Sequence, residues 1–149
     1  MIRKGLLAAG LLLLAFQVGM AQPLNLGEQI TLRGYTGKAF GQVMAENLGL
    51  RSIHVLTNNT SICAALVGAM GSAYLDLQGQ RRMQVTTFAT PEEVPPLRPM
   101  EEAVALIFGG QATAEVNYGL TKNALRSLAE ANYAGGIFFH LRVWGPGFV

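Results

Sequence analysis

The sequence predicts an α+β fold, with a small mixed sheet, two or three helices and βαβ-type units joined by a β-hairpin. Segments with helical periodicity alternate with short strand-like runs, and glycines separate many of these segments. Helical spacing is clearest over residues 38–48, where one face carries Phe40, Val43, Met44 and Leu48. Residues 29–33 and 52–56 are the first strand-like runs. This interleaving of two periods predicts strands and helices within one domain.

The first expected unit is strand, turn, helix and strand. Residues 29–33 alternate apolar and polar side chains, and residues 34–37 form a glycine-bounded turn. The helix over 38–48 ends at Gly49, since glycine readily takes the left-handed conformation that ends helices. Residues 52–56 then form the next strand.

The middle of the chain predicts a hairpin and a long connection. Residues 62–71 fit either a short buried helix or a buried strand. Two strand-like runs, 73–78 and 82–88, flank the turn-prone residues 79–81, which is the pattern of a β-hairpin. Residues 91–99 contain four prolines and are expected to form an extended connection.

The last third predicts two helices and two strands. Residues 100–108 read as a helix whose first turn carries Glu101 and Glu102, where carboxylates oppose the positive end of the helix dipole. Residues 112–118 read as a strand. Thr121 is the expected N-cap of a helix over 122–133, and residues 137–144 form the last strand.

Residues 28–58 and 112–144 resemble each other at an offset of 85 positions. Matching residues include Gly34 with Gly119 and Thr36 with Thr121. The two segments are possible half-units of a duplication. The favoured alternative is that they are two ordinary βαβ units that share a composition.

Residues 1–21 have the three-part layout of a secretory signal peptide. Arg3 and Lys4 precede an apolar run over 6–16, and small residues stand at Gly19 and Ala21. Cleavage after Ala21 leaves a single α+β domain over 22–149. An uncleaved anchor is the alternative, although the run is shorter than the roughly 20 residues of a spanning helix. We expect an exported protein, periplasmic or extracellular, that meets a membrane only transiently through this leader.

Charge excludes one class of partner. With the leader removed, nine basic residues balance nine acidic residues. No basic cluster larger than Arg81-Arg82 occurs, so a nucleic-acid partner is not expected. Charged residues make up only 13% of the chain, which suits a protein that buries surface against an envelope protein or in a homo-oligomer. A tightly packed monomer also fits this composition.

Two stretches resemble the small N-terminal domains of secretins and TonB-dependent receptors. The first combines residues 29–35, the helix containing 43–50 and the strand at Ile53, and the second runs from Met83 to Gly110. The resemblance covers about residues 28–110, although residues 60–81 form a longer link than is usual in that family. It implies a free-standing periplasmic module that binds other envelope proteins, often through a strand edge, without catalysis.

No catalytic, cofactor or metal motif occurs in the sequence. It has no phosphate-binding loop, GxSxG, CxxC or HExxH pattern. His54 and His140 are the two histidines, and no acidic cluster beside either one completes a zinc site. Cys63, the single cysteine, lies among apolar residues and reads as a small buried side chain. The glutamate pairs 92–93 and 101–102 read as a solvated loop and a helix start.

Three functions remain open. The leading one is a non-enzymatic envelope module for protein–protein interaction or self-assembly, with a possible link to a secretin, pilus or secretion apparatus. Its candidate partner-binding residues are Phe139, Trp144 and Phe148. The alternative is a small-molecule carrier whose apolar pocket is lined by residues 62–73. The third is an enzyme that uses Cys63 with a histidine.

Overall fold

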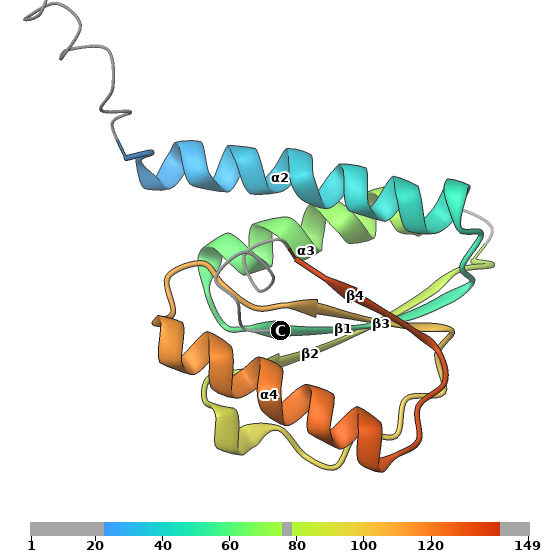
Figure 1. Cartoon of the computed structure of the whole chain (residues 1–149). Helices are drawn as coiled ribbons and strands as arrows, with labels where there is room; N and C mark the ends of the chain where they lie inside the picture. The colour runs from blue at the N-terminus through green and yellow to red at the C-terminus, as the bar shows by residue number, and fades with distance from the viewer. Residues whose placement is uncertain (1–22, 76–78, 141–149) are drawn as a thin grey trace, which may run out of the picture.

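The computed structural model describes residues 23–75 and 79–140 (Figure 1). The expected leader, and both Trp144 and Phe148, lie outside these residues. The described helices are α2 (Leu26–Gln42), α3 (Ser61–Tyr74) and α4 (Ala114–Glu130), with a π-helix η1 (Val43–Asn47) and a 3-10 helix η2 (Pro91–Glu93). The described strands are β1 (Ser52–Asn58), β2 (Arg82–Phe88), β3 (Ala103–Ile107) and β4 (Gly136–Phe139). None of these helices has the length and apolar character needed to cross a membrane.

The four described strands form one parallel sheet. Their order is β2-β1-β3-β4, and β1 lies between β2 and β3. Parallel neighbours need crossover connections. Accordingly, α3 joins β1 to β2, α4 joins β3 to β4, and residues 89–102 carry the chain from β2 past β1 to β3.

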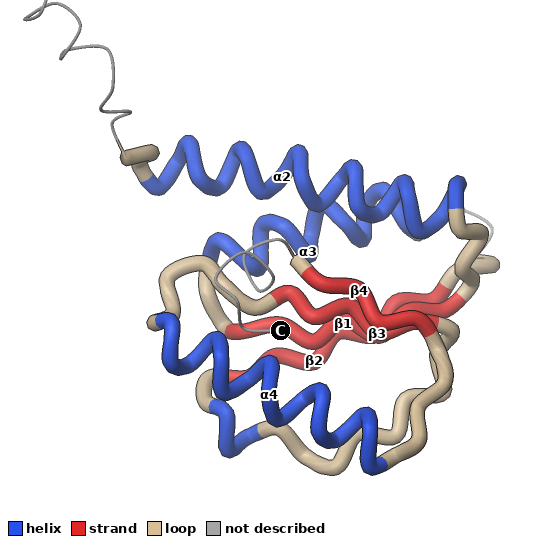
Figure 2. Tube along the Cα trace, viewed as in Figure 1, coloured by secondary structure: helices blue, strands red, loops and turns tan. Residues whose placement is uncertain are grey.

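Helices cover both faces of the sheet. α2 and α3 lie on one face and α4 lies on the other (Figures 1 and 2). The first core packs α3 and η1 on the sheet through residues that include Met44, Ile53, Val55, Leu66, Met70 and Tyr74. The second packs α4 on the opposite face through residues that include Leu56, Val104, Leu106, Leu120, Ala124 and Leu128. Alternate residues of β1 and β3 therefore enter different cores.

The expected α+β class is confirmed, but the predictions of a mixed sheet and a β-hairpin are wrong. Within the described residues every strand pair is parallel, and β2 pairs with β1. Ala73 and Tyr74, expected in a strand, complete α3. The buried series Leu66, Met70 and Tyr74 has a four-residue spacing, which is a helical period, and the Tyr74 hydroxyl donates to the Leu50 carbonyl at 3.1 Å. This also resolves residues 62–71 as helix.

The expected strand over 29–33 is part of α2. A reciprocal capping box starts this helix: Asn25 Oδ1 accepts from the Glu28 N–H at 2.9 Å, and Glu28 Oε2 accepts from the Asn25 N–H at 2.8 Å. The alternation of apolar residues at Ile30 and Leu32 therefore does not mark the buried face of a strand, and Leu32 is exposed on the helix. The helical assignment of 38–48 and the stop at Gly49, where φ is +63°, are confirmed.

The expected helix over 100–108 is instead β3. All five residues of this strand are buried, because it is a central strand with a helix layer on each face. An apolar run of this length has no alternation and cannot be told from a buried helix by period alone.

The expected strand over 112–118 is the first part of α4. Thr113 caps that helix by accepting from the Val116 N–H at 3.3 Å. Thr121, expected as the cap, lies inside α4 and donates to the Asn117 carbonyl at 2.7 Å. Each possible half-unit thus begins with a helix in place of its expected first strand. The described part of the last expected strand is β4.

Candidate ligand-binding sites

The carboxyl ends of the strands meet where the sheet order changes direction. β1 runs into α3 on one face, and the neighbouring β3 runs into α4 on the other. Open parallel sheets commonly bind ligands at such a switch point. Here Asn58 closes the space between the two strands, because its Nδ2 donates to the Gly109 carbonyl and to Asn117 Oδ1, both at 2.8 Å.

Gly110 allows the loop after β3 to lie against the start of α3. Its φ is +66°, and a Cβ at this position would meet Thr60 Oγ1 and would lie 3.4 Å from Cys63 Sγ. Thr60 is the N-cap of α3 and accepts from the Cys63 N–H at 3.3 Å. Close packing therefore fixes the N-terminus of α3 and occupies its side nearest β3.

A cavity of about 440 Å³ opens on the other side of this helix start. It lies between α3 and the carboxyl-terminal halves of β1 and β2. The lining combines hydroxyl, amide and aliphatic side chains: Thr57, Asn58, Asn59, Thr60, Ser61, Ala64, Val67, Val85 and Thr87. None of these nine residues is ionisable. We call this space the carboxyl-edge cavity.

The opposite face of the sheet carries a second polar site around His54. His54 on β1 is buried, and its Nε2 lies 2.8 Å from Thr86 Oγ1 on β2. Its Nδ1 lies 4.0 Å from Glu101 Oε2. Burial lowers the pKa of His54 below its ordinary value of 6.5, while the negative charge of Glu101 opposes that shift. The imidazole is therefore neutral at pH 7.

Three hydrogen bonds hold Glu101 in place through its backbone and its neighbour. The Tyr133 hydroxyl donates to the Glu101 carbonyl at 2.9 Å. The Glu102 N–H donates to Ser52 Oγ at 3.1 Å, and the Arg51 N–H donates to Glu102 Oε2 at 2.6 Å. Burial, followed by the charge of Glu101, raises the pKa of Tyr133, so its hydroxyl stays protonated at neutral pH.

A cavity of about 340 Å³ lies directly over this cluster. His54, Gln84 and Thr86 line it from the sheet, Glu101 lines it from the segment before β3, and residues 95–100 line the rest. A neighbouring cavity of about 410 Å³ shares Gln84, Met100 and Glu101 with it. Together they form the His54 groove, which α4 leaves uncovered.

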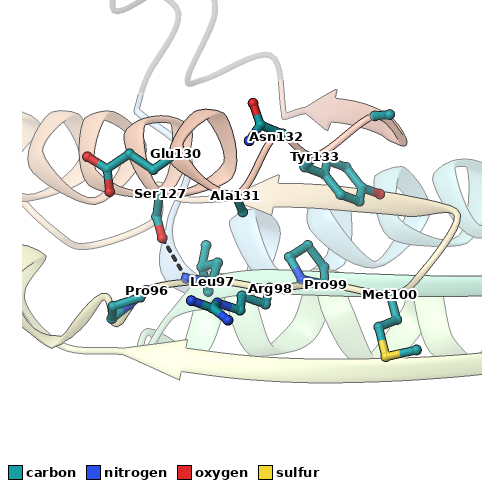
Figure 3. Close-up of a pocket in the computed structure, with 11 residues that line it drawn as sticks. Pro96, Leu97, Arg98, Pro99, Met100, Ser127, Glu130, Ala131, Asn132 and Tyr133 are labelled. Atoms are coloured by element: carbon teal, nitrogen blue, oxygen red, sulfur yellow. Dashed lines mark hydrogen bonds between the residues drawn. The ribbon is translucent and has the colours of Figure 1, made fainter.

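Residues 95–100 separate the His54 groove from a third cavity of about 660 Å³. Figure 3 shows residues that line this third cavity. That cavity lies against the C-terminal end of α4 and is lined by residues that include Ser127, Glu130, Asn132 and Tyr133. Ser127 Oγ accepts from the Leu97 N–H at 2.5 Å and donates to the Pro95 carbonyl at 3.1 Å. Leu97 is buried, so this proline segment is fixed to α4 at its middle.

The candidate partner-binding patch is placed only in part. Phe139 is half-buried in β4 and lines an apolar cavity of about 360 Å³ with Thr36, Ala39, Phe40, Val43 and His140. Trp144 and Phe148 lie outside the described residues, so the patch stays a prediction.

The two histidines and the cysteine lie in different parts of the fold. His140 follows β4, and its Nε2 lies 3.0 Å from Arg33 Nη1 on α2. Cys63 is buried at the start of α3. Across residues 23–75 and 79–140, no group of three or more histidine, cysteine or acidic side chains could hold a metal ion.

The glutamate pairs have roles that the sequence did not indicate. Glu93 Oε2 accepts from the Ala89 N–H at 2.6 Å and so closes the turn after β2. Glu101 and Glu102 precede a strand, so their expected role at a helix start is wrong. The partnership of Glu101, His54 and Thr86 was missed, because the sequence does not give the strand register that brings them together.

Comparison with known proteins replaces the expected resemblance. A family model described as "Uncharacterized protein" matches residues 29–149. No curated protein and no solved structure matches the chain. The resemblance to secretin and TonB-dependent receptor domains is therefore wrong, and its first strand and its second helix are elements of the other type in the structure. The chain belongs to the family of uncharacterized proteins whose model spans these residues.

Proposed function

We propose that this protein binds a small molecule in the carboxyl-edge cavity. The observation that carries the proposal is a space of about 440 Å³ at the start of α3, lined by hydroxyl and amide groups at one end and aliphatic groups at the other. Small-molecule sites commonly have volumes of about 300–1,000 Å³ with a few convergent polar groups. The cavity lies at the strand ends, where parallel sheets commonly bind ligands.

The lining favours a small carboxylate with a short apolar body. The first N–H groups of a helix lack intrahelical partners, and the helix dipole adds positive potential there. Ser61 and Thr60 add hydroxyl groups at this end, whereas Ala64, Val67 and Val85 offer aliphatic contact. Because no lysine or arginine lines the cavity, the helix start is the part of the lining that favours an anion.

A charge substitution at Ser61 tests this proposal. Ser61→Asp places a carboxylate at the first position of α3, which should preserve or slightly raise helix stability because of the dipole. The same charge should repel an anionic ligand. Ala114→Asp is the matched control, since Ala114 is the exposed first residue of α4 and does not line the cavity.

Native mass spectrometry and thermal shift provide the measurements. The protein purified from its own host should retain a ligand mass, or its melting temperature should rise with straight-chain carboxylates from propionate to octanoate. Ser61→Asp should abolish either effect and Ala114→Asp should keep it. An apo mass with no thermal response, or a response that Ser61→Asp leaves intact, would contradict the proposal.

Protein–protein interaction is a second candidate, and the exposed strand β2 favours it. Arg82 donates its N–H to the Arg51 carbonyl, and the Phe88 carbonyl accepts from the Asn59 N–H. Because pairing alternates along a strand, even-numbered residues of β2 bond to β1, and the backbone groups of Met83, Val85 and Thr87 point away from the sheet. Such an edge can accept a strand from an envelope protein or a second copy.

Crosslinking of Val85 variants tests this edge. Val85→Pro removes an outward N–H without disturbing the bonds to β1, whereas Val85→Ala shortens the side chain to a methyl group and keeps the N–H. In-cell crosslinking should recover a partner or a homo-oligomer with wild type and Val85→Ala, and not with Val85→Pro. An unchanged partner profile in Val85→Pro would exclude this edge.

Export remains part of the proposal and rests on the leader-like composition of residues 1–21. A periplasmic or extracellular address suits both candidate functions. It would supply the carboxyl-edge cavity with external solutes and β2 with envelope partners.

A further inference from the structure

The His54 groove contains a hydroxyl, an imidazole and a carboxylate in series, and the candidate functions above use none of them. Thr86 Oγ1 lies 2.8 Å from His54 Nε2, and His54 Nδ1 lies 4.0 Å from Glu101 Oε2. A nucleophile within hydrogen-bond reach of a base, with a third group that orients the base, is the general arrangement of nucleophilic catalysis. We propose that Thr86, His54 and Glu101 form a hydrolytic triad that cleaves small esters.

The charge of Glu101 favours the histidine tautomer that this chemistry requires. The Glu101 carboxylate faces Nδ1 and therefore favours a proton on that nitrogen. Nε2 then carries the lone pair and accepts the Thr86 hydroxyl proton. Because burial keeps the imidazole neutral at pH 7, His54 is available as a base.

Two of the three groups lie on strands, and the third is anchored just before a strand. His54 and Thr86 lie on the paired strands β1 and β2, where Leu56 is the register partner of Thr86, so their hydrogen bond runs diagonally across the sheet. The backbone of Glu101 is fixed by the hydroxyl of Tyr133. Accurate positioning of this kind is what catalysis by orientation requires.

The proposed nucleophile can be reached by a substrate, and donor side chains lie near it. Thr86 is partly exposed, and the 340 Å³ cavity over it is at the small end of the range for ligand sites, which fits a small ester. Gln84 and Arg98 line the same cavity and are the side-chain donors in it that could stabilise an oxyanion.

The reaction consumes one ester and one water molecule. Thr86 Oγ1 bonds to the ester carbonyl carbon while its proton passes to His54 Nε2. The bond from that carbon to the alkoxy oxygen breaks, and the departing alcohol takes the proton from His54. Water then attacks the acyl-threonine and gives its proton to His54, which returns it to Thr86 Oγ1 as the carboxylic acid leaves.

Substitutions at Thr86 test the nucleophile with p-nitrophenyl acetate at pH 7.5. Thr86→Val keeps the shape and should reduce the rate to that of buffer, whereas Thr86→Ser keeps a hydroxyl and should stay within about tenfold of wild type. Ala114→Asp, on the far end of α4, should leave the rate unchanged. Circular dichroism and melting temperature establish that each variant is folded.

Covalent labelling provides the second measurement. An alkyl fluorophosphonate forms an O–P bond with an activated hydroxyl and releases fluoride. Peptide mapping should place the adduct on Thr86 in the wild type, and His54→Gln should reduce labelling and hydrolysis by about 100-fold or more.

Glu101 is a positioning residue, and its readout is the pH profile. Glu101→Gln removes the charge that opposes the lowering of the His54 pKa, so the acid limb of the rate profile should move to lower pH. The inference is overturned if the wild type does not exceed the buffer rate, if Thr86→Val retains activity, or if the adduct forms elsewhere.

Discussion

His54 couples the stability of the fold to pH. Burial lowers its pKa in the folded protein below 6.5, so at mildly acidic pH the unfolded chain binds more protons there. The free energy of unfolding should therefore fall as pH drops below about 6.5, in the window where the unfolded imidazole is charged and the folded one is still neutral.

His54→Gln should reduce this acid dependence, because glutamine does not titrate and can still bond to Thr86. Urea unfolding at pH 7.5 and pH 5.0 measures the difference for both proteins. An identical loss of stability in wild type and His54→Gln would show that His54 does not contribute.

At the scale of single residues, the sequence predicted the environment of individual residues better than it predicted which residues contact each other. It identified Cys63 as buried and Gly49 as a helix stop, because apolar neighbours and glycine chemistry are local signals. It could not connect Asn58 with Asn117, which are 59 positions apart and bond at 2.8 Å. Only the packing of α4 on the sheet brings these amides together.

At the scale of elements, two glycines set the spacing of α2 and α3. Gly37 and Gly41 are buried on α2 and face the carbonyls of Leu66 and Met70 on α3. A Cβ at position 37 would lie 2.9 Å from the Leu66 carbonyl carbon, a separation that real Cβ atoms do not tolerate. Sequence patterning placed Gly34 to Gly37 in a turn, because glycine inside a helix usually weakens it.

Gly37→Ala should therefore destabilise the protein by about 1–3 kcal/mol through forced separation of the two helices. Gly34→Ala is the matched control in the same helix, since nothing lies within 4 Å of its Cβ position. It should stabilise the protein by up to about 1 kcal/mol through helix propensity. Chemical denaturation measures both, and equal effects of the two substitutions would exclude the close-packing argument.

At the scale of the whole molecule, the sheet order decides what each face can do. α4 covers part of one face, where Leu56 of β1 and Phe88 of β2 belong to its core, and the proline segment spans the remaining part above His54, Gln84 and Thr86. The His54 groove lies in that part, whereas the carboxyl-edge cavity lies on the α3 face. The two sites are therefore separated by the sheet and can be tested independently.

The sequence by itself determined the α+β class, a helix over 38–48, strands over 52–56 and 82–88, and the absence of a recognisable catalytic motif. Periodicity, glycine stops and composition are local properties, so they can be read from the chain. The tertiary structure alone decided that the apolar runs 62–71 and 103–107 are a helix and a strand, that the described sheet is parallel, and that His54 meets Thr86 and Glu101. Burial on both sides removes the alternation that marks a strand, and strand register depends on contacts between distant segments.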